Sequence, residues 1–468
     1  MEKLSEKLPK DFKDQMQCLL GEDYSKYEDA LNAEAVRGLR VNTKKVSVQE
    51  FLNNDNFKGK LEKISYAIDG FILNDDGKVG NTVEHLTGQI YLQEPSSMVP
   101  VCSSEIEKEN RPLKILDLCA SPGGKTGQIA SRVSEDSIIF SNEIIKSRAE
   151  VLLSNVERLG LNNVIVLNEE PKNLKIFEGF FDYVFVDAPC SGEGMFRKNP
   201  ETIDEWSEVN VKRCEERQKE ILEIAEKLVS AGGKLVYSTC TFNDREDDEI
   251  VDWFLDSFNY ELVDVPKEIK MVTLGPKLVK NVNCDFARKF LPYTGKGEGQ
   301  FVAVFENKDE YRKTSLYSKK HYRSISQIGQ SENKLVKEFA NSSLNEEFSW
   351  RNLYRVGSSI YFAPIGFDAE MQTALEELKF LSVGVKIGTI EKGRFEPSHT
   401  IFMMMPEKFK NKIELSMDEL KKYMHGEELS SELNEKGYGV VTVNGFAVGG
   451  VKISQKRLKN LYPRGLRI

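Results

Sequence analysis

Short runs of apolar residues alternate with longer amphipathic stretches from about residue 113 onward. Five runs have the length and the Val, Ile, Leu and Phe content of strands: 114–118, 137–142, 164–168, 183–187 and 234–239. The stretches between them have helix-like spacing: 124–133, 145–159, 211–230 and 244–256. Continuous apolar runs suit strands that are buried on both faces, and their alternation with helices predicts a parallel, doubly wound α/β sheet.

The ends of these predicted strands carry the candidate chemistry, because doubly wound sheets bind ligands beyond the carboxyl ends of their strands. The first strand runs into Asp117-Leu-Cys-Ala-Ser-Pro-Gly-Gly-Lys-Thr126, a Gly-rich turn that opens a helix. Such a turn brings backbone N–H groups close to a ligand, although a purely structural turn explains it equally well. Both the dinucleotide pattern G-x-G-x-x-G and the phosphate loop G-x-x-x-x-G-K-[ST] are absent. Glu143 follows the second strand, where a carboxylate either accepts hydrogen bonds from a ribose diol or is a helix-start charge.

Two cysteines follow two strands of the same predicted sheet. Cys190 lies in FVDAPCSGEGMFRK after the fourth strand, and Cys240 lies in YSTCTF after the fifth. A lone cysteine is usually an inert, buried small residue, but two cysteines in these positions point to chemistry. The seven cysteines show no paired spacing and no histidine cluster accompanies them. We therefore expect a reducing cytoplasm, with neither a disulfide scaffold nor a metal site.

The overall charge is acidic, but two segments are basic. The chain has 468 residues, enough for about three domains, and 65 Lys and Arg against 74 Asp and Glu give a net charge of −9. Residues 308–327 hold six Lys or Arg against two acids, and residues 452–468 hold six and no acid. Tyr residues interleave with these cations, a mixture that suits RNA contacts or an ordinary solvated surface. The polar stretch 306–335 is the best linker candidate.

The sequence lacks the hallmarks of a membrane or exported protein. Its uninterrupted apolar runs stay well below the roughly 18 residues of a membrane span. The first residues, MEKLSEKLPKDF, lack the apolar core of a signal peptide. We expect a cytoplasmic protein without a membrane partner.

The motifs LDLCASPGGKT, FVDAPCSGEGMFRK and YSTCTF resemble the signatures of the NOL1/NOP2/Sun family of RNA 5-methylcytosine methyltransferases. The match extends to Arg40-Val-Asn-Thr-Lys44 and Tyr91-Leu-Gln-Glu-Pro-Ser-Ser97 upstream, and to Leu291-Pro-Tyr293 and Gly297-Glu-Gly-Gln-Phe-Val-Ala303 downstream. The tail, with Gly393-Arg-Phe-Glu-Pro-Ser-His399 and Lys459-Asn-Leu-Tyr-Pro-Arg-Gly-Leu-Arg467, is similar to the bacterial RsmF (YebU) branch, which acts on 16S rRNA. The resemblance covers the chain from about residue 35 onward.

This resemblance implies a role for each catalytic residue. Cys240 would be the nucleophile that adds to carbon 6 of cytosine, and Cys190 would help to release the product. The reverse assignment, found in DNA cytosine-5 methyltransferases, is the main alternative. Asp187 would bond the N3/N4 edge of the base. Lys125 and Lys198 are candidates to hold the extruded nucleotide, or are ordinary surface lysines.

The resemblance also implies S-adenosylmethionine as the cofactor. The residues expected to bind it are Cys119, Ala120, Ser121, Pro122, Gly123, Gly124, Lys125, Glu143, Glu170 and Asp187. Glu170 is the nearest match to an acidic contact after the third strand, where some relatives have Asp. Cys119 is interpreted as packing rather than chemistry. Tyr293 replaces the usual histidine of the Leu-Pro-His motif, which removes any imidazole there.

The implied architecture is a Rossmann-like class I methyltransferase core with additions at both ends. We predict an N-terminal RNA-binding extension over 1–90, the core over 91–307, a linker and small α+β domain over 308–382, and a PUA-like RNA-binding domain over 383–468. The leading hypothesis is methylation of cytosine carbon 5 in 16S rRNA or the small ribosomal subunit by a monomer. The alternatives are the same chemistry on tRNA and a non-catalytic ribosome assembly factor.

Overall fold

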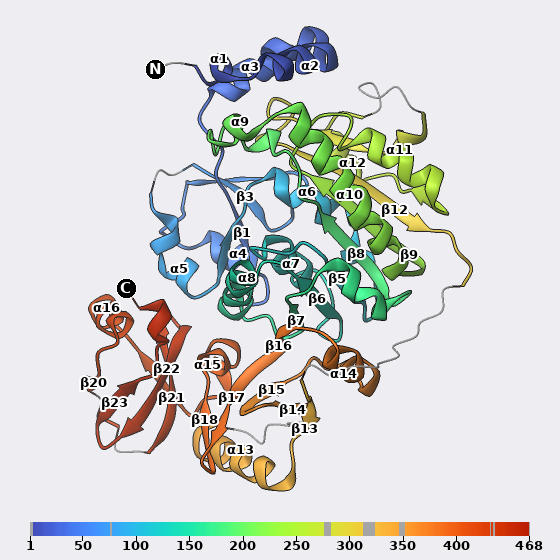
Figure 1. Cartoon of the computed structure of the whole chain (residues 1–468). Coiled ribbons are helices and arrows are strands. Elements are labelled where there is room, and N and C mark those ends of the chain that lie inside the picture. The colour runs from blue at the N-terminus through green and yellow to red at the C-terminus, as the bar shows by residue number, and fades with distance from the viewer. Residues whose placement is uncertain are drawn as a thin grey trace.

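The computed structural model describes residues 3–74, 77–275, 282–311, 323–345, 352–430, 432–433 and 436–467. Across these residues the central sheet has nine strands in the order β10-β12-β9-β8-β5-β6-β7-β16, with β11 paired to β12 (Figure 1). The parallel strands are β5 (Lys114–Asp117), β6 (Ile138–Asn142), β7 (Val164–Leu167), β8 (Phe181–Asp187) and β9 (Val229–Thr239). All five occupy the predicted runs, and the predicted α/β class is confirmed.

Antiparallel strands extend both edges of this sheet. They are β10 (Tyr260–Leu262), β11 (Arg288–Phe290), β12 (Gln300–Asn307) and β16 (Phe380–Val383). The last of these straddles the predicted boundary between the small α+β domain and the PUA-like domain. It pairs antiparallel with β7, so this C-terminal segment is part of the core sheet.

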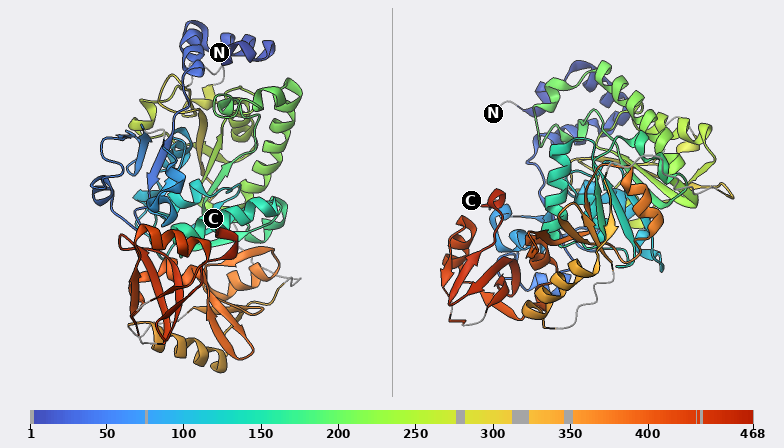
Figure 2. Two further views of the ribbon diagram at one scale, coloured as in Figure 1. Left: turned by 90° about the vertical axis from the view of Figure 1, so that its left-hand side faces the viewer. Right: turned by 60° about the horizontal axis from the view of Figure 1, so that its bottom comes forward.

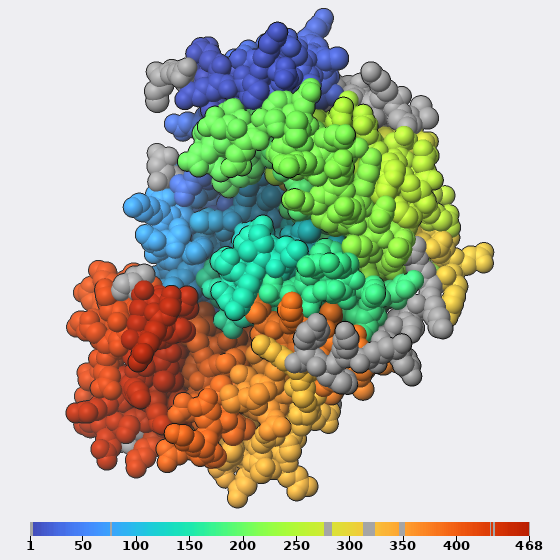
Figure 3. Space-filling view, in the orientation of Figure 1, coloured from blue at the N-terminus to red at the C-terminus, as the bar shows by residue number. Residues whose placement is uncertain are grey.

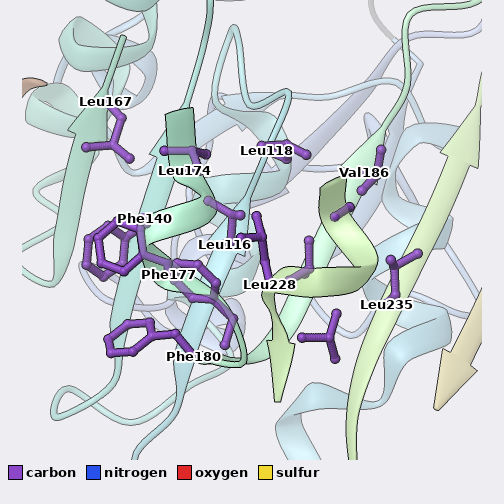
Figure 4. Close-up of a cluster of buried hydrophobic side chains, with 14 of the residues drawn as sticks. Leu116, Leu118, Phe140, Leu167, Leu174, Phe177, Phe180, Val186, Leu228 and Leu235 are labelled. Carbon is purple, nitrogen blue, oxygen red and sulfur yellow. The ribbon is translucent and has the colours of Figure 1, made fainter. Parts of the chain in front are cut away.

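Helices cover both faces of the sheet because each central strand buries residues on both sides. In β5, Leu116 belongs to one apolar cluster and Ile115 to the other. The first cluster includes α10 (Glu208–Leu228) and α11 (Asp248–Ser257), and Figure 4 shows part of it around Phe140 and Phe177. The second includes α6 (Val99–Ser104), α7 (Gly124–Ala130) and α8 (Lys146–Leu159). This is the doubly wound arrangement that the alternating pattern predicts.

The N-terminal region contacts the core through its sheet and, separately, through the three helices that precede the sheet. Its sheet has the order β2-β3-β1-β4, with β1 (Gly38–Val41), β2 (Leu61–Lys63), β3 (Gly70–Leu73) and β4 (Ile90–Leu92). Arg40 of β1 is 1% exposed and donates hydrogen bonds to Asp69, Gln93 and Ser131 at the end of α7. The short helices α4 (Val48–Leu52) and α5 (Val83–Leu86) complete this part.

Three helices precede that sheet and pack against the core on their own. They are α1 (Leu4–Lys7), α2 (Lys10–Leu20) and α3 (Tyr24–Asn32). Phe12 of α2 packs edge-on against Phe196 and Trp206, with ring centroids 5.1 and 5.5 Å apart. Phe196 and Trp206 lie on either side of α9 (Thr202–Glu205). The N-terminal helices therefore cover the segment that follows Cys190 (Figures 1 and 3). Beyond β10, α12 (Lys267–Lys270) packs near α6.

Apart from β16, the C-terminal region forms a lobe below the core sheet in Figure 1, and Figure 2 shows it from two further sides. It holds two five-stranded sheets within the described residues. The first contains β13 (Ser326–Gln327), β14 (Leu353–Val356), β15 (Ser359–Phe362), β17 (Val385–Glu391) and β18 (Arg394–Pro397). The second contains β19 (Asn411–Glu414), β20 (Leu429–Ser430), β21 (Gly437–Val443), β22 (Phe446–Ser454) and β23 (Arg457–Asn460). The helices of this lobe are α13 (Gln330–Ser343), α14 (Ala369–Glu376), α15 (His399–Met404) and α16 (Met417–His425).

Two of the three predicted domain boundaries fall inside strands, and one falls at the end of a strand. The boundary at 90/91 lies within β4, the one at 307/308 follows β12, and the one at 382/383 lies within β16. Within the predicted linker 306–335, residues 312–322 lie outside the described part, as do Tyr317 and Tyr322 of the basic segment. The third tyrosine of that segment, Tyr311, is described and is 79% exposed. Across the described ranges, helices remain too short or too polar to span a bilayer.

Candidate active site

The carboxyl ends of β5, β8 and β9 open into a cleft, where parallel sheets present their ligand sites. The core residues that line it come from the predicted motifs: Asp117, Cys119, Ala120, Ser121, Pro122, Gly124, Lys125, Asp187, Met195, Lys198 and Cys240. The rest come from β4 with the segment after it and from the turn and first residue of β12: Tyr91, Leu92, Gln93, Glu94, Ser97, Glu298, Gly299 and Gln300. The structure therefore gathers the three central motifs around one cavity.

Cys190 and Cys240 lie side by side at this edge. Their Sγ atoms are 3.3 Å apart, both thiols are free, and both side chains are half-buried. The hydrogen bond with Cys240 raises the pKa of Cys190 well above its usual value, and burial raises it further. Cys190 therefore holds its proton more tightly than an ordinary thiol, which suits it to donate a hydrogen bond to the sulfur of Cys240.

Asp187 ends β8 and is anchored on both carboxylate oxygens. Oδ1 accepts from Ser238 Oγ at 2.8 Å and from Gln300 Nε2 at 3.1 Å. Oδ2 accepts from Lys125 Nζ at 2.7 Å, and the aspartate side chain stays 34% exposed to the cleft. The sequence placed Lys125 and Asp187 in two different loops, and the fold brings them into one ion pair.

The Gly-rich turn after β5 is shaped by close contacts. Gly123 has φ +106°, a conformation that L side chains rarely adopt. A Cβ on Gly124 would lie 3.2 Å from the ring of Tyr91, so glycine lets the turn close against the N-terminal sheet. Asp117 is buried behind it, and burial raises its pKa to about 6. Its Oδ2 accepts from Thr126, whereas Oδ1 is buried without a hydrogen-bond partner.

The two predicted acidic contacts have different surroundings. Glu143 is 4% exposed, accepts from Ile145 N at 2.9 Å and pairs with Arg148 at 3.3 Å. Its charge contributes to the raised pKa of Cys119, after burial and the charges of Asp117 and Asp187. Glu143 itself is not among the residues that line the cleft. Glu170 is half exposed and pairs with Lys172 on the surface.

Tyr293 and Lys198, the two remaining predicted candidates, also differ. Lys198 is exposed at the cleft. Tyr293 contacts the N-terminal helices instead, and its hydroxyl reaches Asp23 at 3.5 Å.

Sequence comparison gives matches along nearly the whole chain. "Ribosomal RNA small subunit methyltransferase F" of Escherichia coli O139:H28 is 30% identical over 451 residues, which is 92% of this chain and 90% of that protein. The protein of the same name from Enterobacter sp. (strain 638) is 29% identical over 445 residues, which is 92% of this chain and 89% of that protein. The chain belongs to the RsmF family of 16S rRNA methyltransferases.

Family sequence profiles divide the RsmF-family chain into four matches. "16S rRNA methyltransferase RsmB/F" matches residues 105–306, and the "N-terminal domain of 16S rRNA methyltransferase RsmF" matches 8–95. The "RsmF rRNA methyltransferase first C-terminal domain" matches 338–405, and the "Methyltransferase RsmF PUA domain" matches 410–468. The predicted resemblance and the PUA-like region are confirmed.

Solved structures support the fold of this RsmF-family member. A methyltransferase homolog from Pyrococcus horikoshii is 30% identical, with a TM-score of 0.55 over 63% of this chain and 93% of that one. NSun6 from the same organism, solved with SFG, is 18% identical with a TM-score of 0.56, over 64% of this chain and 99% of that one, and shares the fold.

Several residues at the site of this family member escaped the sequence analysis. Gln300 and Ser238 bind Asp187, and Gln93 and Glu94 line the cleft. All four lie within motifs that carry the resemblance, so the motifs located them without revealing their partners. Their contacts join residues up to 113 positions apart, a separation at which no sequence pattern indicates contact.

Proposed function

We propose that this protein transfers the methyl group of S-adenosylmethionine to carbon 5 of a cytosine in 16S rRNA. The observation that carries the proposal is the pair of thiols, 3.3 Å apart, beside the anchored carboxylate of Asp187. The reaction needs a nucleophile at carbon 6 and a proton acceptor at carbon 5. Two neighbouring sulfur atoms can serve these two neighbouring ring carbons. Membership of the RsmF family and the names of the relatives support 16S rRNA as the substrate.

The residues of the cleft fit S-adenosylmethionine, which supplies an electrophilic methyl group on a sulfonium. The turn from Cys119 to Lys125 presents backbone groups at the start of α7, as a ligand-binding turn requires. The unpartnered Oδ1 of Asp117 offers an acceptor to an ammonium group. Glu143, directly after β6, would take a ribose diol, and Glu170 remains the predicted further acidic contact.

Cys240 acts first in the proposed mechanism. Its sulfur bonds to carbon 6, and the electron pair of the C5–C6 double bond moves to carbon 5, which then takes the methyl group. The hydrogen bond donated by Cys190 stabilises the attacking thiolate. Asp187, held by Lys125, Ser238 and Gln300, accepts hydrogen bonds from the N3/N4 edge and stabilises the N3-protonated ring as the adduct forms.

Cys190 acts in product release. Once Cys240 is bonded to carbon 6, its charge is gone and the hydrogen bond that raises the pKa of Cys190 is lost. Cys190 then releases its proton to solvent, and its thiolate accepts the proton of carbon 5. The electrons of that C–H bond restore the C5–C6 double bond and expel the sulfur of Cys240, so the enzyme returns unchanged.

Before it can react, the target cytosine must be extruded from the structured RNA, which costs a few kcal/mol of unstacking free energy. Contacts to phosphates outside the core offset this cost. The N-terminal extension beside the cleft and the PUA-like lobe with its basic tail are the proposed RNA-binding parts.

Methyl transfer from labelled S-adenosylmethionine to 30S subunits, free 16S rRNA and bulk tRNA tests this function, followed by bisulfite mapping. We expect label at a cytosine of the small-subunit RNA. Label in tRNA alone would overturn the substrate assignment, and label at another atom or base would overturn the reaction.

A further inference from the structure

Two buried glutamates connect the loops that carry the cysteines. Glu193 lies three residues after Cys190, and Glu246 lies six residues after Cys240. Their side chains are 1% and 0% exposed. Neither is among the residues that line the cleft, and the mechanism above uses neither. Buried carboxylates are costly unless hydrogen bonds compensate them, so their partners show what they stabilise.

Glu193 binds the loop of the other cysteine. Its Oε2 accepts from the backbone N–H groups of Phe242 at 2.8 Å and Asn243 at 3.1 Å, two and three residues after Cys240. Its Oε1 accepts from Asn243 Nδ2 at 3.0 Å and from Trp206 Nε1 at 2.9 Å. The carboxylate of the Cys190 loop therefore holds the backbone of the Cys240 loop.

Glu246 makes the reciprocal connection. Its Oε2 accepts from the backbone N–H of Ser191, the residue after Cys190, at 3.0 Å. The same oxygen accepts from Gln218 Nε2 at 2.8 Å, and that nitrogen also donates to the carbonyl of Pro189, the residue before Cys190. Glu246 thus fixes the backbone on both sides of Cys190, directly at Ser191 and through Gln218 at Pro189.

We propose that Glu193 and Glu246 are positioning residues for the cysteine pair: each accepts backbone N–H groups of the opposite loop, and together they fix the two sulfur atoms at the separation the reaction needs. The inference rests on the proposed function. Two further contacts support the same connection, from Gly194 N to the carbonyl of Cys240 at 2.9 Å and between Ser191 and Thr241 hydroxyls at 2.9 Å. Small displacements of reacting groups slow catalysis by about 100-fold per ångström, which is why such fixing matters.

Glu246 also acts on Cys190 through its charge. The pKa of Cys190 is raised first by its hydrogen bond to Cys240, then by burial and the charge of Cys240, and then by the charge of Glu246. The other titratable groups that face this pair are Glu193, Asp247, Cys214 of α10 and Tyr237 of β9. A neutral side chain at position 246 should therefore let Cys190 ionise at lower pH.

Two variants of Glu246 separate position from charge. Glu246→Gln keeps an acceptor oxygen and removes the charge, whereas Glu246→Asp keeps the charge and shortens the reach to Ser191. The pH dependence of Cys190 alkylation by iodoacetamide is followed on the full chain by peptide mass spectrometry. We expect the midpoint to fall in Glu246→Gln and to stay near the wild-type value in Glu246→Asp.

Methyl transfer to RNA is measured on the same proteins, with circular dichroism as the test of folding. We expect both variants to slow it about 10- to 100-fold. Asp182→Asn is the matched control, because Asp182 also accepts a backbone N–H, that of Lys114, but at the opposite end of β8. It should keep nearly wild-type transfer.

The inference would be overturned by wild-type transfer in either folded Glu246 variant, by an unmoved midpoint in Glu246→Gln, or by an equal loss in Asp182→Asn. If Glu246→Gln fails to fold, Glu246→Asp still decides through its transfer rate. The alkylation midpoint needs neither RNA nor S-adenosylmethionine, so it tests the connection even if the proposed function fails.

Discussion

Lys125 Nζ donates to Asp187 Oδ2 at 2.7 Å, and this contact joins the Gly-rich turn after β5 to the end of β8. The lysine side chain is 10% exposed and the aspartate 34%. The pair therefore lies at the floor of the cleft with the carboxylate still accessible. In the proposed mechanism it holds a negative charge where the N3/N4 edge of the base must dock.

Asp187→Asn should lower kcat about 100-fold, because the amide cannot stabilise positive charge on the ring. The binding of S-adenosylmethionine should change much less, since the turn and Glu143 remain. Single-turnover methyl transfer and calorimetric cofactor binding measure the two effects. A loss confined to cofactor affinity would contradict the assigned role.

Glu143→Ala should weaken S-adenosylmethionine binding about tenfold or more, because a charged hydrogen-bond acceptor to the ribose is lost. Glu170→Ala is the informative comparison, since that carboxylate is half exposed and paired with Lys172. We expect a smaller loss of affinity there, because solvent screens the exposed group. Titration calorimetry without RNA measures the affinity of each variant for S-adenosylmethionine. Equal losses of affinity in the two variants would contradict this ranking.

Stability should fall with acid partly through His399. Burial, with a further contribution from the charge of Lys45, lowers its pKa to about 4 from 6.5, and its Nδ1 has no hydrogen-bond partner. Above pH 6.5 both the folded and the unfolded states hold the neutral ring. Between 6.5 and 4 the unfolded state binds the extra proton, so stability is lost as the pH falls through this window.

His399→Gln should remove this contribution, which is about 2 kcal/mol at pH 5. Urea unfolding at pH 7.5 and pH 5 measures the loss in each protein. The variant should lose less stability between the two pH values than the wild type. Burial also lowers the pKa of His85 to about 4, but His85 is present in both proteins, so its contribution to the loss of stability cancels in the comparison. An identical loss would contradict the assignment.

The sequence predicted the core well because its strands are buried on both faces. The run 164–168 became β7 at 164–167, and 137–142 became β6 at 138–142. Periodicity could not reveal β16, since this short strand pairs with β7 from more than 200 residues away. Long-range pairing of this kind depends on the fold and leaves no local pattern.

The sequence placed the candidate catalytic residues near strand ends, but their hydrogen-bond partners could not be predicted. Cys190, Cys240 and Asp187 follow strand ends, where the topology alone brings them together. Glu193 and Glu246 looked like ordinary loop acids, because burial is a property of the packed structure. Gln300 was visible only as part of a motif, and its contact with Asp187 needs the return of β12 beside β9.

The central claim is that Cys240 forms the covalent bond to RNA and Cys190 releases it. The most direct measurement incubates wild type, Cys190→Ala, Cys240→Ala and the double variant with labelled 16S rRNA and S-adenosylmethionine, then separates the products on denaturing gels. We predict a stable protein–RNA adduct in Cys190→Ala, and neither adduct nor methylation in Cys240→Ala or the double variant. An adduct in Cys240→Ala, or continued methylation by it, would contradict the account.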